Sequence, residues 1–206
     1  MKKIYFFTQK LSDAAQMVQW RQKICIRWSE LLRQEAEIMI SVEIPEGLDK
    51  VQRYRLISVR LQGIAASEKD SLACLCNFMA FLYWTMGDVS WVGLYIRRGG
   101  DLVLGPFCGK PACSRIAMGK GVCGTAAETQ RVQIVPDVSR FPGHIACDSA
   151  SRSEIVFPLF ADGQLWGVLD IDSPVLGRFD ESDKKGLEPA AEMIEKLAAA
   201  LDKKTV

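Results

Sequence analysis

Two strand–turn–strand patterns dominate the chain after residue 90. The first occupies residues 91–105 and turns at the Gly-Gly-Asp of residues 99–101; the second occupies residues 153–172 and turns at the Asp-Gly of residues 162–163. The hydrophobic pattern of each arm has a period of two, which is typical of β-strands, and the turn residues tolerate a tight backbone reversal. The sequence therefore predicts two antiparallel β-hairpins.

Helical patterns surround these hairpins. The sequence predicts an amphipathic helix over residues 68–86 and a closing helix from about Asp180 to Leu201, because apolar residues recur there at helical spacing. The predicted buried side of the first helix consists of Leu72, Leu75, Cys76, Met79 and Leu82. Together, helices and hairpins predict an α+β domain with a central antiparallel sheet flanked by helices.

The segment between the hairpins, residues 105–150, is rich in Gly, Pro, Ser and Asp. We expect it to be mostly irregular, with a turn of helix after Gly121 and a short strand at residues 132–135. Irregular segments of this length inside a compact domain usually carry function.

We expect a separate helical N-terminal extension over residues 1–50 and the main domain over residues 51–206. Ser12 is a candidate N-cap, and the turn-rich residues 42–47 form the linker. The extension carries seven basic and two acidic residues up to Arg33. This charge could mark a targeting, partner-docking or membrane-surface helix, but a solvated helix packed on the main domain is the favoured interpretation.

The composition excludes several classes of protein. A net charge of +1 gives no reason to expect nucleic acid or an anionic membrane as a partner. No apolar run approaches the ~18 residues of a transmembrane helix, and the apolar start at residues 2–8 is too short for a signal peptide. Seven cysteines, an odd number, fit a reducing cytoplasmic compartment with a few functional thiols better than a secreted disulfide framework.

Three cysteines, Cys113, Cys123 and Cys147, lie among turn-forming and charged residues, where thiols become reactive. Cys123 stands between two glycines where a helix is expected to begin, and Cys147 follows His144 by three residues. Small buried side chains or an opportunistic metal site are the alternatives. The gaps of 10 and 24 residues do not match the paired cysteines of structural zinc sites, so we expect no metal.

Carboxylates and aromatic residues form a second group of candidates. Asp170 and Asp172 end a predicted strand and share one face, and Glu154 begins the preceding strand. These carboxylates could form a solvated edge, a cation site, a trap for an ammonium group, or a proton source if burial raises a pKa. Trp91 and Tyr95 also share a face, and their pattern favours a role as core aromatics.

Several motifs in this order resemble the free methionine-(R)-sulfoxide reductases, enzymes built on a GAF domain. The motifs are Gly-Lys-Pro-Ala-Cys113, Gly-Lys-Gly-Val-Cys123-Gly-Thr, Gly-His-Ile-Ala-Cys147-Asp-Ser-Ala-Ser-Arg-Ser-Glu154 and Gly-Val-Leu-Asp-Ile-Asp172. The resemblance runs from about residue 60 to 200 and leaves the first fifty residues outside. Cys108 departs from it, since the family more often has glutamine there, and this thiol close to Cys113 leaves the resolving step open.

The resemblance implies free L-methionine (R)-sulfoxide as the substrate and no metal or organic cofactor. It also implies that Cys147 attacks the sulfoxide, that Cys113 resolves the product as a disulfide, and that Cys123 serves as a back-up or relay thiol. A dithiol such as thioredoxin would then reduce the disulfide. The substrate-binding residues implied in the same way are Trp91, Tyr95, Glu154, Asp170 and Asp172.

A different class of function remains as the alternative, namely a GAF-type small-molecule or redox sensor without catalysis. A member of the family that keeps the fold and has lost the activity is a third reading. The sequence contains no DNA-binding helix pair and no kinase motif that would serve a sensor's output. It does not determine the oligomeric state and allows a homodimer.

Overall fold

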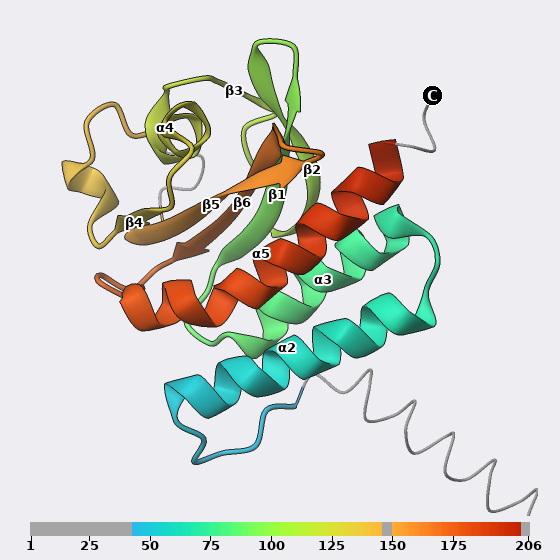
Figure 1. Cartoon of the computed structure of the whole chain (residues 1–206). Coiled ribbons are helices and arrows are strands. Elements are labelled where there is room, and N and C mark those ends of the chain that lie inside the picture. Colours follow the sequence, from blue (N-terminus) through green and yellow to red (C-terminus); the bar gives the residue numbers. More distant parts are fainter. Residues whose placement is uncertain (1–42, 146–149, 203–206) are drawn as a thin grey trace, which may run out of the picture. The chain divides into compact units, whose positions relative to one another are not determined.

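A six-stranded antiparallel sheet forms the centre of the structure (Figure 1). The computed structural model describes residues 43–145 and 150–202 of the 206-residue chain. Ser12 and Cys147, which the sequence singled out, therefore lie outside the described residues. No helix among the described residues is long and apolar enough to cross a membrane.

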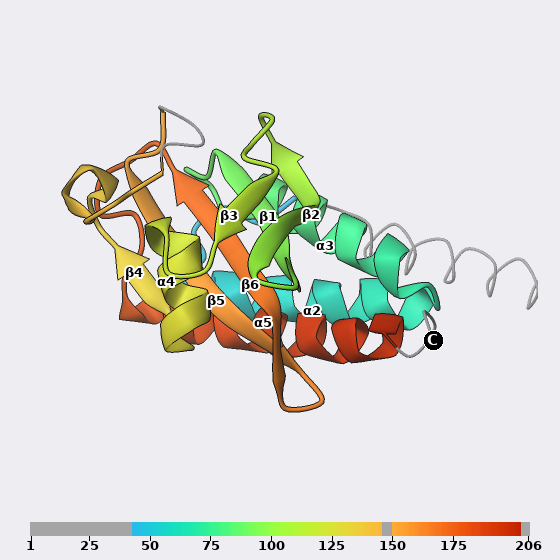
Figure 2. The same ribbon diagram turned by 90° about the horizontal axis from the view of Figure 1, so that it is seen from above.

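The two predicted hairpins are confirmed, and they lie side by side because β1 pairs with β6. The strand order across the sheet is β3-β2-β1-β6-β5-β4. Figure 2 shows the sheet from above. The strands are β1 (Trp91–Arg98), β2 (Asp101–Gly109), β3 (Arg115–Ala117), β4 (Gln133–Val135), β5 (Ser153–Ala161) and β6 (Gln164–Ser173).

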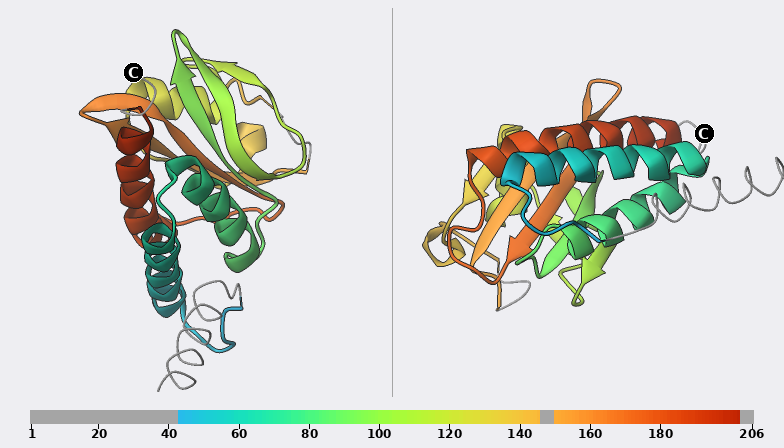
Figure 3. Two further views of the ribbon diagram at one scale, coloured as in Figure 1. Left: turned by 90° about the vertical axis from the view of Figure 1, so that its right-hand side faces the viewer. Right: turned by 90° about the horizontal axis from the view of Figure 1, so that it is seen from below.

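Helices cover both faces of this sheet and complete the predicted α+β architecture. The helices are α2 (Lys50–Ser67), α3 (Ser71–Thr85), α4 (Gly121–Thr129) and α5 (Glu181–Asp202). The first two and α5 lie together on one face, and α4 lies on the opposite face (Figures 1 and 3).

Alternation along the central strands divides the core into two parts. On β1, Val92, Leu94 and Ile96 join the core beneath the three helices, whereas Trp91 and Tyr95 join the smaller core beneath α4. The same period of two operates on β5 and β6. Side chains at even positions near the ends of β5 and β6 therefore face α4, and this is where the candidate carboxylates stand.

The prediction of which α3 residues are buried is partly wrong. Leu75, Met79 and Leu82 are buried, but Leu72 is 48% exposed and Cys76 is exposed. The carboxylate of Asp70 caps the helix by accepting hydrogen bonds from the Leu72 and Ala73 amides, and the buried positions beyond this cap also include Cys74 and Phe78. All these positions are apolar or small, so composition did not reveal which of them face the sheet.

The region between the hairpins is more ordered than predicted. Strand β2 continues to Gly109, β3 follows at Arg115, and α4 has nine residues instead of a single turn. Helix α2, which the sequence analysis did not assign, is also present. It buries only Tyr54, Ile57 and Leu61, so its apolar stripe is narrow and hard to recognise in the sequence.

Candidate active site

One row of neighbouring residues crosses three strands on the face covered by α4. In the sheet register, Glu154 of β5 stands opposite Asp172 of β6, which stands opposite Trp91 of β1. Asp170 lies two residues before Asp172, and both aspartates point to the same face of the sheet because strand side chains alternate. Residues 154, 170 and 172, which are far from residue 91 in sequence, therefore meet it at one end of these three strands.

The two aromatic residues of β1 stack at this site. The ring centroids of Trp91 and Tyr95 are 5.8 Å apart with an interplanar angle of 25°. Gly93 lies between them on the same face, and a Cβ built on it would come within 2.2 Å of the Trp91 ring. The absent side chain of this glycine therefore makes the stacking possible.

These aromatic residues also hold the loop that carries Cys113. The indole nitrogen of Trp91 donates a hydrogen bond to the Lys110 carbonyl (3.1 Å), and the hydroxyl of Tyr95 donates one to the Cys113 carbonyl (3.0 Å). The interpretation of Trp91 and Tyr95 as core aromatics is thus incomplete: both are buried, and each also uses its polar atom to fix the loop at residues 110–113.

Cys113 is half-buried and disulfide-bonded. The free cysteines among the described residues are Cys74, Cys76, Cys108 and Cys123, so none of these is its partner. Cys108 is half-buried on β2, paired in register with Val92, and does not line the cavity described below.

Cys123 lies in the first turn of α4, where the sequence predicted the start of a helix. It is buried, and its Sγ is 3.9 Å from Oε1 of Glu154. Burial, followed by the charges of Asp170 and Glu154, raises the pKa of the Cys123 thiol well above its usual value. The position on the helix is as expected, but the neighbouring carboxylates stabilise a protonated thiol and not a thiolate.

Two of the three carboxylates are buried. Burial, together with the neighbouring charges of Asp170 and Asp172, raises the pKa of Glu154 well above its usual value. Burial also raises the pKa of Asp170 from 3.8 to about 6. Among the described residues, Oδ1 of Asp170 is buried and has no hydrogen-bond partner. Asp172 is half-buried at the rim.

His144 approaches Glu154, with Nε2 4.0 Å from its Oε2. Burial lowers the pKa of His144, which favours the neutral imidazole. The sequence suggested that His144 could orient the Cys147 thiol; Cys147 lies outside the described residues, so this stays a prediction. The contact with Glu154 was not anticipated, since ten residues separate the two side chains.

The site surrounds a small cavity of about 30 Å³. Its lining residues are Ile116, Lys120, Gly121, Val122, Cys123, His144, Ile145, Ser151, Glu154, Asp170 and Asp172. Ser151 was missed by the sequence analysis; it is buried, and within the described part of the chain its hydroxyl has no hydrogen-bond partner. A lone serine in a Ser-rich stretch gave no signal that would have singled it out.

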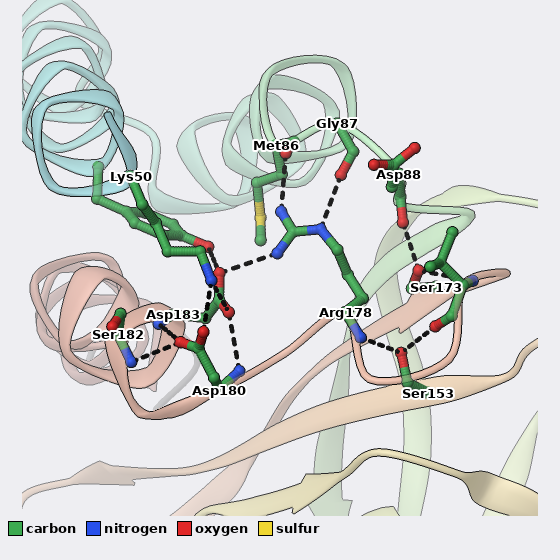
Figure 4. Close-up of polar contacts among 12 residues, drawn as sticks. Lys50, Met86, Gly87, Asp88, Ser153, Ser173, Arg178, Asp180, Ser182 and Asp183 are labelled. Atoms are coloured by element: carbon green, nitrogen blue, oxygen red, sulfur yellow. Dashed lines mark hydrogen bonds and ion pairs between the residues drawn. The ribbon is translucent and has the colours of Figure 1, made fainter. Parts of the chain in front are cut away.

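The ends of the strands that carry the carboxylates are fixed by hydrogen bonds to neighbouring loops (Figure 4). The hydroxyl of Ser153, next to Glu154, donates to the Val175 carbonyl (2.6 Å) and accepts from the Arg178 amide (3.3 Å). The hydroxyl of Ser173, next to Asp172, donates to the carbonyl of Asp88.

Arg178 extends this network to the helices. Its guanidinium donates to the carbonyls of Met86 and Gly87 at the end of α3, and to Oδ1 of Asp183 on α5 (2.9 Å). Asp183 also accepts hydrogen bonds from the Tyr54 hydroxyl and the Lys50 ammonium, each at 2.7 Å. The strand ends are therefore anchored to three helices, which keeps the carboxylates in place.

A buried carboxyl group whose pKa is raised can donate a proton to an oxygen that gains charge, and a carboxylate at the rim can bind an ammonium group. A disulfide-bonded cysteine held beside them adds redox chemistry by thiol–disulfide exchange. The arrangement suits reduction of a small cationic or zwitterionic oxidised substrate.

Comparison with known proteins gives consistent matches. Residues 72–198 match the family model described as GAF domain. The chain is 46% identical over 157 residues to the free methionine-R-sulfoxide reductase of Escherichia coli, which covers 76% of this chain and 95% of that protein. The free methionine-R-sulfoxide reductase of Saccharomyces cerevisiae is 39% identical over 163 residues, and the match covers 75% of this chain and 91% of that protein.

A solved structure is similar as well. The crystal structure of the free methionine-R-sulfoxide reductase from Neisseria meningitidis in complex with its substrate is 43% identical to this chain, with a TM-score of 0.72, and the match covers 76% of this chain and 96% of that one.

Proposed function

The chain belongs to the free methionine-R-sulfoxide reductase family of GAF-domain oxidoreductases, and from this membership we propose that it reduces free L-methionine (R)-sulfoxide to methionine. The observation that carries the proposal is the disulfide-bonded Cys113, held by Tyr95 next to a buried group of carboxylates.

The first chemical step is attack by the Cys147 thiolate on the sulfoxide sulfur. The sulfoxide oxygen takes up a proton and is transferred to Cys147, which becomes a sulfenic acid as methionine leaves. Glu154 is the proposed proton donor, because burial and the neighbouring charges of Asp170 and Asp172 raise its pKa well above the usual value, which favours the protonated carboxyl group.

The second step resolves the sulfenic acid. The Cys113 thiol attacks the Cys147 sulfur, water leaves, and a Cys113–Cys147 disulfide forms. An external dithiol of the thioredoxin class then reduces this disulfide by exchange and restores both thiols. Cys123 acts as a reserve thiol, in keeping with its protonated state near neutral pH.

The remaining residues bind the substrate. Asp170 and Asp172 hold the ammonium group and help Glu154 to polarise the sulfoxide, while Trp91 and Tyr95 form the wall around the methyl end. The cavity of about 30 Å³ must widen to admit an amino acid. We also propose a reducing cytoplasmic setting, because the thiols must be regenerated after each turnover.

The test is NADPH consumption coupled through thioredoxin, measured with resolved free methionine (R)-sulfoxide, free (S)-sulfoxide and a peptide-bound sulfoxide. Turnover of the free (R) form alone supports the proposal. Binding of a small molecule or a reversible thiol oxidation without turnover of any sulfoxide would instead support a sensor role.

A further inference from the structure

Cys123, Glu154 and Asp170 bring one sulfur and two carboxylates into a cluster that the proposed reaction uses only in part. One potential ligand atom from each residue lies within 4.8 Å of the other two, and all three side chains are buried. His144 adds an imidazole nitrogen 4.0 Å from Oε2 of Glu154. Sulfur, imidazole nitrogen and carboxylate oxygen are the donor types that zinc accepts in proteins.

The distances are close to those of a coordination sphere. Bonds of about 2.3 Å to sulfur and about 2.0–2.2 Å to nitrogen or oxygen place tetrahedral ligand atoms about 3.3–3.6 Å apart. The observed separation between Sγ of Cys123 and Oε1 of Glu154 is 3.9 Å. This pair is therefore close to the spacing of two ligands, whereas the cluster as a whole, whose atoms lie within 4.8 Å of one another, must contract around an ion, and His144 must move toward Cys123 and Asp170 to join it.

A second, independent observation points to a ligand at this place. Oδ1 of Asp170 lacks a hydrogen-bond partner among the described residues, and the residue is only 6% exposed. An unsatisfied buried polar atom carries an energetic cost that a bound ion or water would remove. The adjoining cavity of about 30 Å³, which all four side chains line, has room for a single ion or water molecule.

We propose that Cys123, Glu154, Asp170 and His144 form a binding site for a zinc-type divalent cation. A thiolate and an imidazole favour a borderline-soft ion such as Zn²⁺ over Mg²⁺ or Ca²⁺, which prefer oxygen ligands. The spacing of the three candidate cysteines excluded a cysteine-paired zinc site, but the present site uses one cysteine with carboxylates from neighbouring strands. Such ligands leave no local spacing signature in the sequence.

Binding requires the Cys123 thiol to lose its proton to solvent as the sulfur–metal bond forms. An occupied site would also fill the cavity that the proposed substrate must enter, so the cation would inhibit the enzyme. This inhibitory consequence rests on the proposed function, whereas binding itself does not. The experiment therefore measures binding without substrate.

The test uses the full chain in its oxidised form, in which the Cys113 sulfur is already bonded. Metal-free protein is titrated with Co²⁺ under anaerobic conditions, and a thiolate-to-cobalt charge-transfer band is recorded; Zn²⁺ should then displace the cobalt. We expect a saturable band in the wild-type chain, loss of this band in Cys123→Ser, and an unchanged band in the control Cys108→Ser. Glu154→Gln and Asp170→Asn should keep the band but weaken the affinity about tenfold or more.

Two results would overturn the proposal: no band in the oxidised wild-type chain, or a band that persists in Cys123→Ser. If near-ultraviolet circular dichroism shows that Cys123→Ser fails to fold, the cobalt affinities of Glu154→Gln and Asp170→Asn test the proposal instead. Unchanged cobalt affinity in both carboxylate variants would then assign the cavity to an ordered water molecule.

Discussion

The Sγ of Cys123 lies 3.9 Å from Oε1 of Glu154, although 31 residues separate them along the chain. A thiol in the first turn of a helix is normally expected to have a lowered pKa. In this protein, burial and the charges of Asp170 and Glu154 instead raise the pKa of the Cys123 thiol. Burial also raises the pKa of both carboxyl groups, which suits Glu154 to the role of proton donor. The raised pKa of the Cys123 thiol separates its role from that of an attacking nucleophile.

The roles of the cysteines in the proposed reaction can be separated by counting turnovers. Cys147→Ser should abolish methionine formation, because the attacking thiolate is removed. Cys113→Ser should form about one methionine per enzyme and then stall, because the sulfenic acid has lost its resolving thiol. Methionine formed per enzyme, without and with thioredoxin, is the measurement.

Cys108→Ser is the matched control for these substitutions. Its thiol does not line the cavity, so turnover should stay within about twofold of the wild-type value. A Cys147→Ser protein that still reduces the sulfoxide would refute the assignment of the nucleophile.

Asp170 should reduce the stability of the folded protein at neutral pH. Its folded-state pKa is raised to about 6, so its favourable contribution is present below about pH 4 and is lost as the pH rises through 6. Above pH 6 the folded protein carries the cost of an ionised, buried carboxylate at this position. Asp170→Asn removes that cost and should raise the free energy of unfolding by up to about 3 kcal/mol at pH 8, with little difference near pH 4. Urea denaturation at both pH values is the measurement.

Asp101→Asn is the control for Asp170→Asn. The Asp101 side chain, at the start of β2, is 45% exposed, so this substitution should change the free energy of unfolding much less than Asp170→Asn does at either pH. An Asp170→Asn chain that is less stable than the wild type at pH 8 would contradict the prediction. Such a result would mean that the asparagine amide is poorly accommodated or that Asp170 is charged and stabilised in the folded state.

Gly93 should be essential for the stacking of Trp91 on Tyr95. In Gly93→Ala, the added methyl group would meet the Trp91 ring at 2.2 Å and the Cβ of Phe107 at 2.6 Å. We expect a loss of about 1–3 kcal/mol in the free energy of unfolding and a changed near-ultraviolet circular dichroism spectrum. Gly100→Ala, whose Cβ would meet nothing within 4 Å, should change neither quantity.

Arg178 should be among the most important polar side chains for stability. Arg178→Met leaves the carbonyls of Met86 and Gly87 without this donor and weakens the pairing of the buried Asp183. We expect destabilisation of about 3–5 kcal/mol, measured by chemical denaturation. Arg140→Met removes a solvent-exposed ion pair with Asp137 and should have no measurable effect. Equal effects of the two substitutions would show that the buried network does not stabilise the fold.

The local patterns of the sequence determined much of the architecture. A period of two around Gly-rich turns predicted both hairpins, and the boundaries of β1, β5 and β6 agree with it within one or two residues. The closing helix α5 was recognised for the same reason, because a strong apolar stripe is a local property. The motifs around the cysteines identified the family, as the comparisons confirm.

Other features depended on contacts that no local pattern records. Helix α2 went unassigned because only three of its residues are buried, and the inward face of α3 was misjudged at Leu72 and Cys76 because every candidate position was apolar or small. Which side of such a helix is buried is decided by the sheet and helices against which it packs.

The candidate site also has features that the sequence predicted and features that only the tertiary structure decided. The sequence by itself placed Asp170 and Asp172 on one strand face and Cys123 at the start of a helix, since both follow from backbone periodicity. Only the tertiary structure brought Cys123, His144 and Glu154 together, through the register between β5 and β6 and the position of α4 over them. The pKa shifts also belong to the tertiary structure, because burial and the approach of like charges arise only when distant segments pack together.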